Sequence, residues 1–220
     1  MALTFPLSRA QFFDLLPLSS GHLVLPDTTR TSRTQGGEIL RAEYAARLWE
    51  AELRLGPMTA DEAAAVLPLV HLLGGAGASF MLADATRLFP RRDPTGGLLG
   101  SAAPALNSIG ANRRDITLKG LPAGYILSRR DLLAFPYGAT PTRYALHEIV
   151  NAQVTANPDG TTPAIEVVPP VREGAAVDAP VTLKRPACKA IIVPRSFQSG
   201  SMRSGTITEG VSFRVQQTLR

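Results

Sequence analysis

Few side chains in this sequence are suited to covalent or metal chemistry. The chain has one cysteine, Cys188, and three histidines, His22, His71 and His147, which lie far apart in the sequence. Nucleophilic catalysis needs an activated serine or cysteine beside a base, and no G-x-S-x-G sequence is present. The histidines and the cysteine have no metal-ligand spacing. We therefore expect no catalytic nucleophile and no metal site, and we expect Cys188 to be a small core residue.

Three acidic residues and one glycine-rich segment are the remaining candidates for chemistry. Asp131, Glu148 and Glu166 could form a carboxylate pair, but their spacing does not require one, and solvated strand faces often carry such residues. The sequence GGAGAS, from Gly74, resembles a phosphate loop, yet it follows a predicted helix and lacks the lysine of a P-loop. The sequence therefore predicts that the protein is not an enzyme and binds no cofactor.

The net charge of +5 is carried mainly by arginine, because the only lysines are Lys119, Lys184 and Lys189. Arginine is suited to fixed contacts at interfaces. Several arginines form separated pairs in predicted turns: Arg91-Arg92, Arg113-Arg114 and Arg129-Arg130. This dispersion favours a solvated surface or a subunit interface. Nucleic-acid binding is a second interpretation, and it requires the arginines to converge on one face.

The apolar segments of the chain are short. None approaches the ~20 consecutive apolar residues of a membrane-spanning helix. The N-terminal segment is interrupted by Pro6, Arg9, Asp14 and Pro17, so it has the pattern of neither a signal peptide nor an anchor. We expect a soluble protein in which residues 1–220 form a single structural unit.

One helix is predicted by clear start and stop signals, at about residues 59–73. Thr59 followed by Glu62 is a capping box, and Gly74-Gly75 can end the helix. Most residues between them are apolar, which predicts a helix buried on most sides. Pro68 should bend its axis. His71 is expected to have a structural role.

The segments on either side of this helix are predicted to be strands. Residues 38–55 alternate in polarity, with a change of phase that a bulge near Leu48 would produce. A second strand is expected at residues 79–84. Residues 36–90 would then form a β-α-β part whose helix covers one face of a sheet.

Two segments are predicted to be irregular. Residues 28–37 are rich in Thr, Arg and Gly, so we expect an exposed loop. Residues 89–115 contain Pro and Gly at short intervals, which predicts a long loop that could serve as an arm to a neighbouring molecule.

The remainder, residues 116–220, is expected to be a β-barrel-like part. Short β-prone runs alternate with turn sequences such as NPDG. The expected strands are residues 116–118, 125–127, 132–135, 144–154, 164–168, 190–193 and 210–219. Gly200-Ser201 and Ser204-Gly205 are expected in a hairpin loop. The chain as a whole is thus predicted to be mainly β (α+β), as a sandwich or split barrel with one flanking helix.

The order of these features resembles a family of phage proteins. An Arg-containing loop ending in Gly-Gly-Glu is followed by LWEAELRLGPMTADEAAAVLPLVHLLGGAGASFML, then by GLPAGYILSRRDLLAF, RYALHEIV and IEVVPPVREG. Over roughly residues 36–220 this pattern resembles the distal tail protein, or another tail-tip protein, of siphovirus-like bacteriophages and related prophages. The family commonly has Gly-Asp where this chain has Arg130-Asp131, so a different backbone geometry is expected at that turn.

The resemblance implies a tail-tube-like fold and a structural function. Such proteins form a closed ring, commonly hexameric, that joins the tail tube to the tail tip and surrounds the DNA channel. The implied partners are further copies of this chain, the tail tube protein and the tail-tip hub protein, with DNA only in transit and no membrane. The implied location is the virion, at the tail tip, after assembly in the host cytoplasm.

Within such a ring, some residues become candidates for specific contacts. Glu50 and Glu52 could face the lumen, where negative charge lets DNA pass, or they could be ordinary solvent-facing carboxylates. The candidates for contacts between subunits are Arg30, Arg33, Arg91, Arg92, Arg113 and Arg114.

A different class of function is a peripheral tail-tip β-sandwich that binds the host surface. That function predicts an exposed aromatic patch, which could come from Tyr125, Phe135, Tyr137 and Tyr144. Burial of these rings in the core is the competing interpretation, because aromatic residues in strands usually pack inward.

Overall fold

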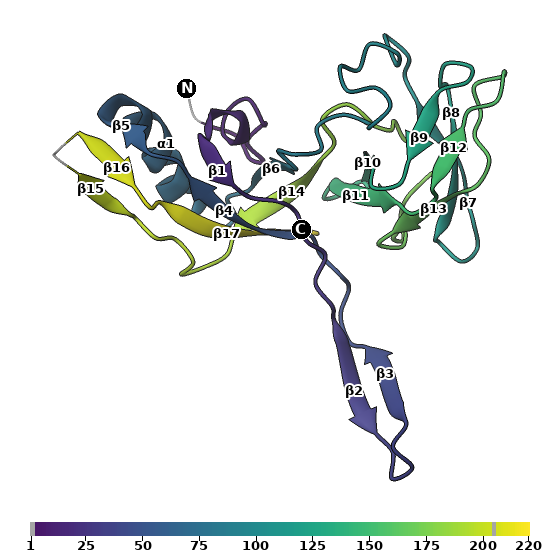
Figure 1. The fold of residues 1–220 in the computed structure, drawn as a ribbon, viewed down its shortest axis with the longest axis horizontal. Coiled ribbons are helices and arrows are strands. Elements are labelled where there is room, and N and C mark those ends of the chain that lie inside the picture. The colour runs from purple at the N-terminus through teal and green to yellow at the C-terminus, as the bar shows by residue number, and fades with distance from the viewer. Residues whose placement is uncertain (1–2, 204–205) are drawn as a thin grey trace.

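The computed structural model describes residues 3–203 and 206–220. Over these residues the chain is mainly β with a single α-helix, and it contains two curled five-stranded sheets (Figure 1). The first sheet has the order β1 (Leu18–Ser20), β4 (Glu50–Leu55), β17 (Ser212–Gln217), β14 (Ala187–Ile192) and β6 (Phe80–Ala83). The second has the order β10 (Leu132–Tyr137), β11 (Arg143–Ile149), β13 (Ile165–Val168), β8 (Asp115–Lys119) and β7 (Ala105–Ile109).

The sheets pack around two hydrophobic cores, and the core of the first sheet also takes Leu132, Ala134 and Leu146 from β10 and β11 of the second sheet. In β4, Ala51, Leu53 and Leu55 are buried, whereas the alternate residues face outward, as the period-two pattern predicts. The first core also contains Phe80, Phe213 and Phe13 of the short 3₁₀ segment η1 (Phe13–Leu15). Cys188 is fully buried there, and burial raises the pKa of its thiol to about 12, so its predicted role as a core residue is confirmed.

The predicted helix is confirmed as α1 (Ala60–Leu73), with the expected capping box. Glu62 donates its backbone N–H to the Thr59 hydroxyl at 3.4 Å, and the Glu62 carboxylate accepts from the Thr59 backbone N–H at 2.8 Å. The prediction that the helix is buried on most sides is wrong. Only the stripe Ala63, Val66, Val70 and Leu73 is buried, because only one side of α1 meets the sheet.

The predicted strand over residues 38–55 is two strands in different sheets. β3 (Ile39–Glu43) pairs with β2 (Thr29–Arg33), whereas β4 pairs with β1 and β17. The change of phase near Leu48 therefore marks a chain connection and not a bulge. The strands around the helix also differ from a simple β-α-β unit, because β17 and β14 lie between β4 and β6. Immediately before α1, strand β5 (Met58–Thr59) pairs antiparallel with β16 (Ile207–Glu209).

The segment 89–115 is packed against the second sheet and is not a free arm. β7 lies within it, and Leu99 is buried in the second core. Asp93 is 1% exposed, and its carboxylate accepts the backbone N–H groups of Leu98 and Leu99 at 3.0 and 2.9 Å. These hydrogen bonds hold the loop in place. The spacing of apolar residues in the sequence could not have predicted them.

Residues 116–220 do not form one barrel-like part. Strands β8, β9 (Ile126–Ser128), β10 and β13 appear close to where they were expected, but the single strand expected at 144–154 is two strands. They are β11, in the second sheet, and β12 (Gln153–Thr155), which pairs with β9. However, β14 and β17 lie in the middle of the first sheet. The β15 (Ser201–Arg203) and β16 strands form a hairpin, but Ser201, which was expected in its loop, is in strand β15 and pairs with Glu209. Ser204 and Gly205, also expected in the loop, lie outside the described residues. Strand propensity predicted these elements but not their partners.

The turn at Arg130-Asp131 contains a non-glycine residue with a positive φ. Arg130 has a φ of +72°, in the left-handed region that glycine favours. The backbone at Arg130 therefore takes a conformation that glycine would adopt easily. The buried Asp131 carboxylate accepts the Ser128 and Arg91 backbone N–H groups at 2.7 and 2.9 Å, which holds this turn.

Candidate functional site

The most distinctive surface feature is a β-hairpin that projects away from both sheets (Figure 1). It consists of β2 and β3, paired in register from Thr29 with Glu43 to Arg33 with Ile39. The prediction of a loop at residues 28–37 is therefore wrong, because most of these residues form strand β2 and the first part of a tight turn. Every residue of the two strands except the half-buried Thr29 is exposed.

One face of this hairpin carries most of its apolar side chains, and the opposite face carries Ile39, which is 52% exposed. Leu40, Ala42 and Tyr44 alternate along one face, where Leu40 is 53% and Tyr44 62% exposed. The Arg30 guanidinium lies 5.2 Å from the centre of the Tyr44 ring, a cation–π contact on that face. Apolar groups this exposed, on an element that belongs to neither core, indicate a contact surface.

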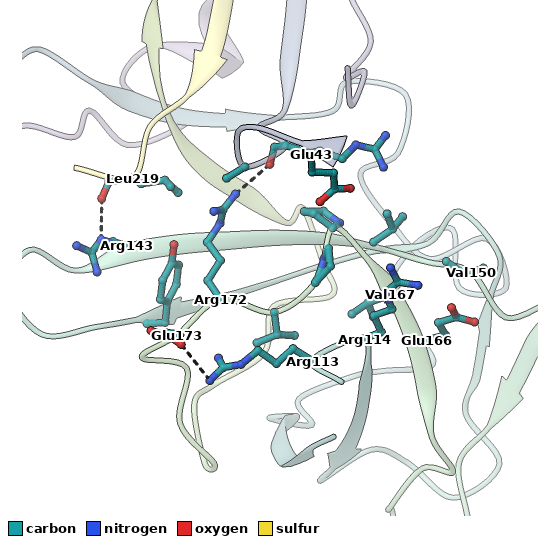
Figure 2. Close-up of a pocket in the computed structure, with 17 residues that line it drawn as sticks. Glu43, Arg113, Arg114, Arg143, Val150, Glu166, Val167, Arg172, Glu173 and Leu219 are labelled. Atoms are coloured by element: carbon teal, nitrogen blue, oxygen red, sulfur yellow. Dashed lines mark hydrogen bonds and ion pairs between the residues drawn. The ribbon is translucent and has the colours of Figure 1, made fainter. Parts of the chain in front are cut away.

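A groove of about 720 Å³ lies beside the base of the hairpin, between the two sheets (Figure 2). Its lining contains five arginines and three glutamates. The charged lining residues are Arg47, Arg113, Arg114, Arg143, Arg172, Glu43, Glu166 and Glu173. The arginines come from four separate segments of the chain, so the fold and not the local sequence brings them together.

Main-chain carbonyl groups hold three of these arginines. Arg172 donates from Nη2 to the Arg47 carbonyl oxygen at 2.9 Å, and Arg143 donates from Nε to the Leu219 carbonyl oxygen at 2.7 Å (Figure 2). Arg47 donates in turn to the Leu25 carbonyl oxygen at 2.9 Å. These acceptors fix the guanidinium groups in position and carry no formal charge that would neutralise them.

Arg113 is the exception among the groove arginines. Its Nη2 lies 3.8 Å from the Glu173 carboxylate, in an exposed ion pair (Figure 2). Among the residues that the structure describes, Arg47, Arg114, Arg143 and Arg172 have no carboxylate oxygen within 4.0 Å. The groove is therefore electropositive despite its glutamates.

A buried tyrosine lines the groove. Tyr137 is 4% exposed, and its hydroxyl group has no hydrogen-bond partner among the described residues. Burial raises the pKa of Tyr137, while the charges of Arg172 and Arg143 act in the opposite direction. Tyr137, Arg143 and Arg172 all line the groove.

A buried histidine lies behind the same wall. His147, in β11, is 2% exposed, and its Nδ1 lies 2.6 Å from the carbonyl oxygen of Pro169, a lining residue of the groove. Burial lowers the pKa of His147 to about 4, although this hydrogen bond opposes the shift. The ring is thus neutral at pH 7, with the proton on Nδ1 donated to the carbonyl.

The candidate lumen residues lie on the outer face of the first sheet. Glu52 is exposed and pairs with Arg54 at 2.9 Å, and Glu50 is half-buried and accepts a hydrogen bond from Gln216 Nε2 at 2.6 Å. Arg214 is the register partner of Glu52 on β17. The face therefore carries both signs of charge.

The six arginines predicted for subunit contacts fall into three places. Arg30 and Arg33 are on the hairpin, Arg113 and Arg114 line the groove, and Arg91 and Arg92 lie in the turn after β6. Sequence reasoning missed Arg47, Arg143 and Arg172 as site residues, and it considered Tyr137 only for an exposed aromatic patch. No local signal could have found them, since only the tertiary fold brings β10, β11 and the 169–173 segment together with residue 47.

The other candidates for chemistry have structural partners. Asp131 binds backbone N–H groups, Glu148 pairs with Arg87, and Glu166 lies in the groove. His71 packs edge-on against Phe197 at 5.5 Å, in keeping with a structural role. Tyr125, Phe135 and Tyr137 are buried and Tyr144 is half-buried, so these rings do not form an exposed aromatic patch.

Comparison with known proteins gives no family assignment: no family model matches the sequence, and the search of curated proteins finds no significant match. In the described residues, no helix has both the length and the apolar character needed to cross a bilayer.

Proposed function

We propose that this protein is a structural subunit of a phage tail, with the role of a distal tail protein. In this proposal, copies of the chain form a ring, with six the expected number, that joins the tail tube to the tail tip and surrounds the DNA channel. The proposal starts from the sequence resemblance. The tail tube protein and the tail-tip hub protein would be its neighbours in the virion.

The observation that carries the proposal is the projecting hairpin. Its strands pair only with each other, so both outer edges offer unpaired N–H and C=O groups. It also exposes Leu40 and Tyr44, although neither residue contributes to a core. An element of this kind gains its stabilising contacts from another molecule, and in a ring that molecule is the adjacent subunit.

The outer face of α1 offers a second contact surface. Ala64, Ala65, Pro68 and Leu72 are exposed on the side of the helix that does not meet the sheet. Leu72 is 42% exposed. A helix with apolar residues on its free face is suited to packing against a neighbour in an assembly.

A lumen position for Glu50 and Glu52 is part of this proposal, with one qualification of its physical basis. Arg54 and Arg214 lie beside them on the same face and offset their charge. Passage of DNA past this face would therefore depend on balanced charge and not on a purely negative surface. DNA delivery unaffected by Glu50→Lys with Glu52→Lys would contradict the lumen position.

The first test is the mass of the purified protein by light scattering, with negative-stain images of the same sample. We expect rings with a central hole. Leu40→Ser with Tyr44→Ser should reduce the assembly to monomers, because these changes remove the apolar face of the hairpin. Val177→Ser, at a site 51% exposed in the second half of the chain, is the matched control and should leave rings intact.

Three results would count against this proposal: the first and the third against the ring itself, and the second against the hairpin as the subunit contact. A monomer that binds host envelope would instead favour a peripheral tail-tip module that recognises the host surface. Rings that survive both hairpin substitutions would show that the hairpin is not the subunit contact. Strong, salt-sensitive binding of duplex DNA by the free monomer would favour the nucleic-acid interpretation of the arginines.

A further inference from the structure

We propose that the groove beside the hairpin is a binding site for carboxylate side chains on an acidic peptide segment of a partner protein. Arg143 and Arg172 are its principal ligands, and the Tyr137 hydroxyl group is an additional donor. This inference goes beyond the proposed tail function and does not depend on it. It assigns a chemical class of ligand to a groove of about 720 Å³.

The first argument is the state of the arginine charges. Arg143 and Arg172 are half-buried, and no carboxylate of the described residues lies within 4.0 Å of either one. Arg143 uses Nε and Arg172 uses Nη2 in bonds to main-chain carbonyl oxygens. Each guanidinium therefore keeps further N–H groups for a ligand. Fixed, partly desolvated guanidinium groups are well suited to bind carboxylates through two N–H bonds.

The second argument is the tyrosine in the wall of the groove. The buried Tyr137 hydroxyl group has no hydrogen-bond partner among the described residues, and an unpaired buried donor costs free energy. The Oη–H group is therefore available to a ligand that brings an acceptor. Arg143 and Arg172 line the same groove as this tyrosine. A carboxylate bound between the two arginines would supply the missing acceptor after a small shift of the side chains.

The third argument favours a peptide over a nucleic acid as the ligand of the groove. Glu43, Glu166 and Glu173 also line the groove, so its positive charge is confined to the arginine positions and does not form the continuous basic track that a phosphate backbone needs. The lining includes Val167, Pro170 and Val171, which offer contacts to the aliphatic part of a side chain. At about 720 Å³, the groove has room for a few side chains of an extended segment.

The test uses the full chain and a fluorescein-labelled hexaglutamate peptide, with hexaglutamine as the uncharged probe and a short DNA duplex as the polyanion. Binding is measured by fluorescence anisotropy at low and physiological salt. We expect hexaglutamate to bind more tightly than the other two probes. Arg172→Gln and Arg143→Gln should each weaken its binding about tenfold, because each removes a charge-assisted contact.

Two further variants separate binding from folding. Tyr137→Phe removes no hydrogen bond made within the described residues, so its thermal midpoint should not fall, whereas hexaglutamate binding should weaken about threefold or more. Arg92→Gln removes the same charge from an exposed turn and should leave binding within about twofold of the wild type.

Several outcomes would overturn the proposal. One is equal binding of hexaglutamate and hexaglutamine by the wild type. A second is an equal loss of binding in Arg92→Gln and Arg172→Gln, which would reflect general attraction to a basic protein. Tighter binding of duplex DNA, lost in the groove variants, would make the groove a nucleic-acid site. None of these results depends on whether the protein forms rings, so this proposal and the tail function can fail separately.

Discussion

Trp49 donates its indole Nε1–H to the main-chain carbonyl oxygen of Leu146 at 2.7 Å, and this hydrogen bond joins the two sheets. Trp49 is 2% exposed and lies just before β4, whereas Leu146 is in β11. Arg87 makes a second connection between the two halves. It pairs with Asp84, just after β6, at 2.9 Å and also with Glu148 of the second sheet. The relative position of the sheets is therefore set by specific buried contacts.

Replacing Trp49 by Phe should destabilise the protein by about 1–3 kcal/mol. The change leaves the Leu146 carbonyl oxygen without its donor inside the core and removes part of a packed ring. Urea unfolding at equilibrium gives the free energy. Tyr44→Phe, at an exposed ring, is the control and should change it by less than about 0.5 kcal/mol. A loss for Trp49→Phe no larger than the control value would contradict this role.

Replacing Thr59 by Ala should cost about 1 kcal/mol, because it removes the hydroxyl group that accepts the Glu62 backbone N–H. Thr59→Ser keeps the acceptor and should preserve most of the stability. Thermal unfolding followed by circular dichroism compares the two variants. Equal losses for Ala and Ser would mean that the capping box contributes little to α1.

His147 should make the stability depend on pH between about 6.5 and 4. Its pKa falls from 6.5 in the unfolded chain to about 4 in the folded protein, so folding excludes the charged ring. The contribution is complete above pH 6.5 and is lost as the pH falls, by about 3 kcal/mol at pH 4. His147→Asn keeps a donor for the Pro169 carbonyl and should flatten the urea-unfolding profile in this range. An unchanged slope would rule out His147 as the titrating group.

Shortening the hairpin should leave the fold intact. Replacing residues 30–42 by a brief Gly-Ser turn removes no member of either core, so the free energy of unfolding should change by less than about 1 kcal/mol. The shortened protein should remain monomeric if the hairpin is the subunit contact. A large loss of stability would show that the hairpin supports the fold itself.

Asp93 should control the order of the segment between β6 and β7. Burial alone would raise the pKa of Asp93, but the bonds from Leu99, Leu98 and Tyr125 hold it below its usual value, so the carboxylate is charged at pH 7. Asp93→Ala should increase amide hydrogen exchange across residues 93–102 more than elsewhere. Thr95→Ala, at an exposed site in the same segment, should not. Uniform exchange in both variants would exclude this local role.

The sequence predicted the elements of the fold better than their arrangement. The α1 boundaries followed from Thr59, Glu62 and Gly74, because capping is local chemistry within a few residues. The pairing of β17 with β4 had no local signal, since alternation in polarity specifies which face is buried and not which strand lies alongside. The same limit explains why β14 and β17 were expected in a barrel with β8 to β13.

The candidate site was less accessible to sequence reasoning than the fold. Arg30 and Arg33 were expected at a contact, and they lie on the projecting hairpin, but its strand structure was missed because Thr, Ser and Arg suggested a loop. Arg143 and Arg172 stood in unremarkable strand and turn contexts. Their importance comes from the missing carboxylate partners, which only the tertiary structure reveals.

The position of β14 and β17 in the first sheet has a consequence for how the chain folds during synthesis. Strands β7 to β13 form a continuous stretch, so the second sheet can close as soon as the ribosome has made it. The first sheet has only β1, β4 and β6 until then, and β4 and β6 do not touch without β14 and β17 between them. The nascent chain must therefore keep Leu53, Phe80 and the buried stripe of α1 from aggregating until residues 187–217 emerge, which makes this half the one that would depend on a chaperone.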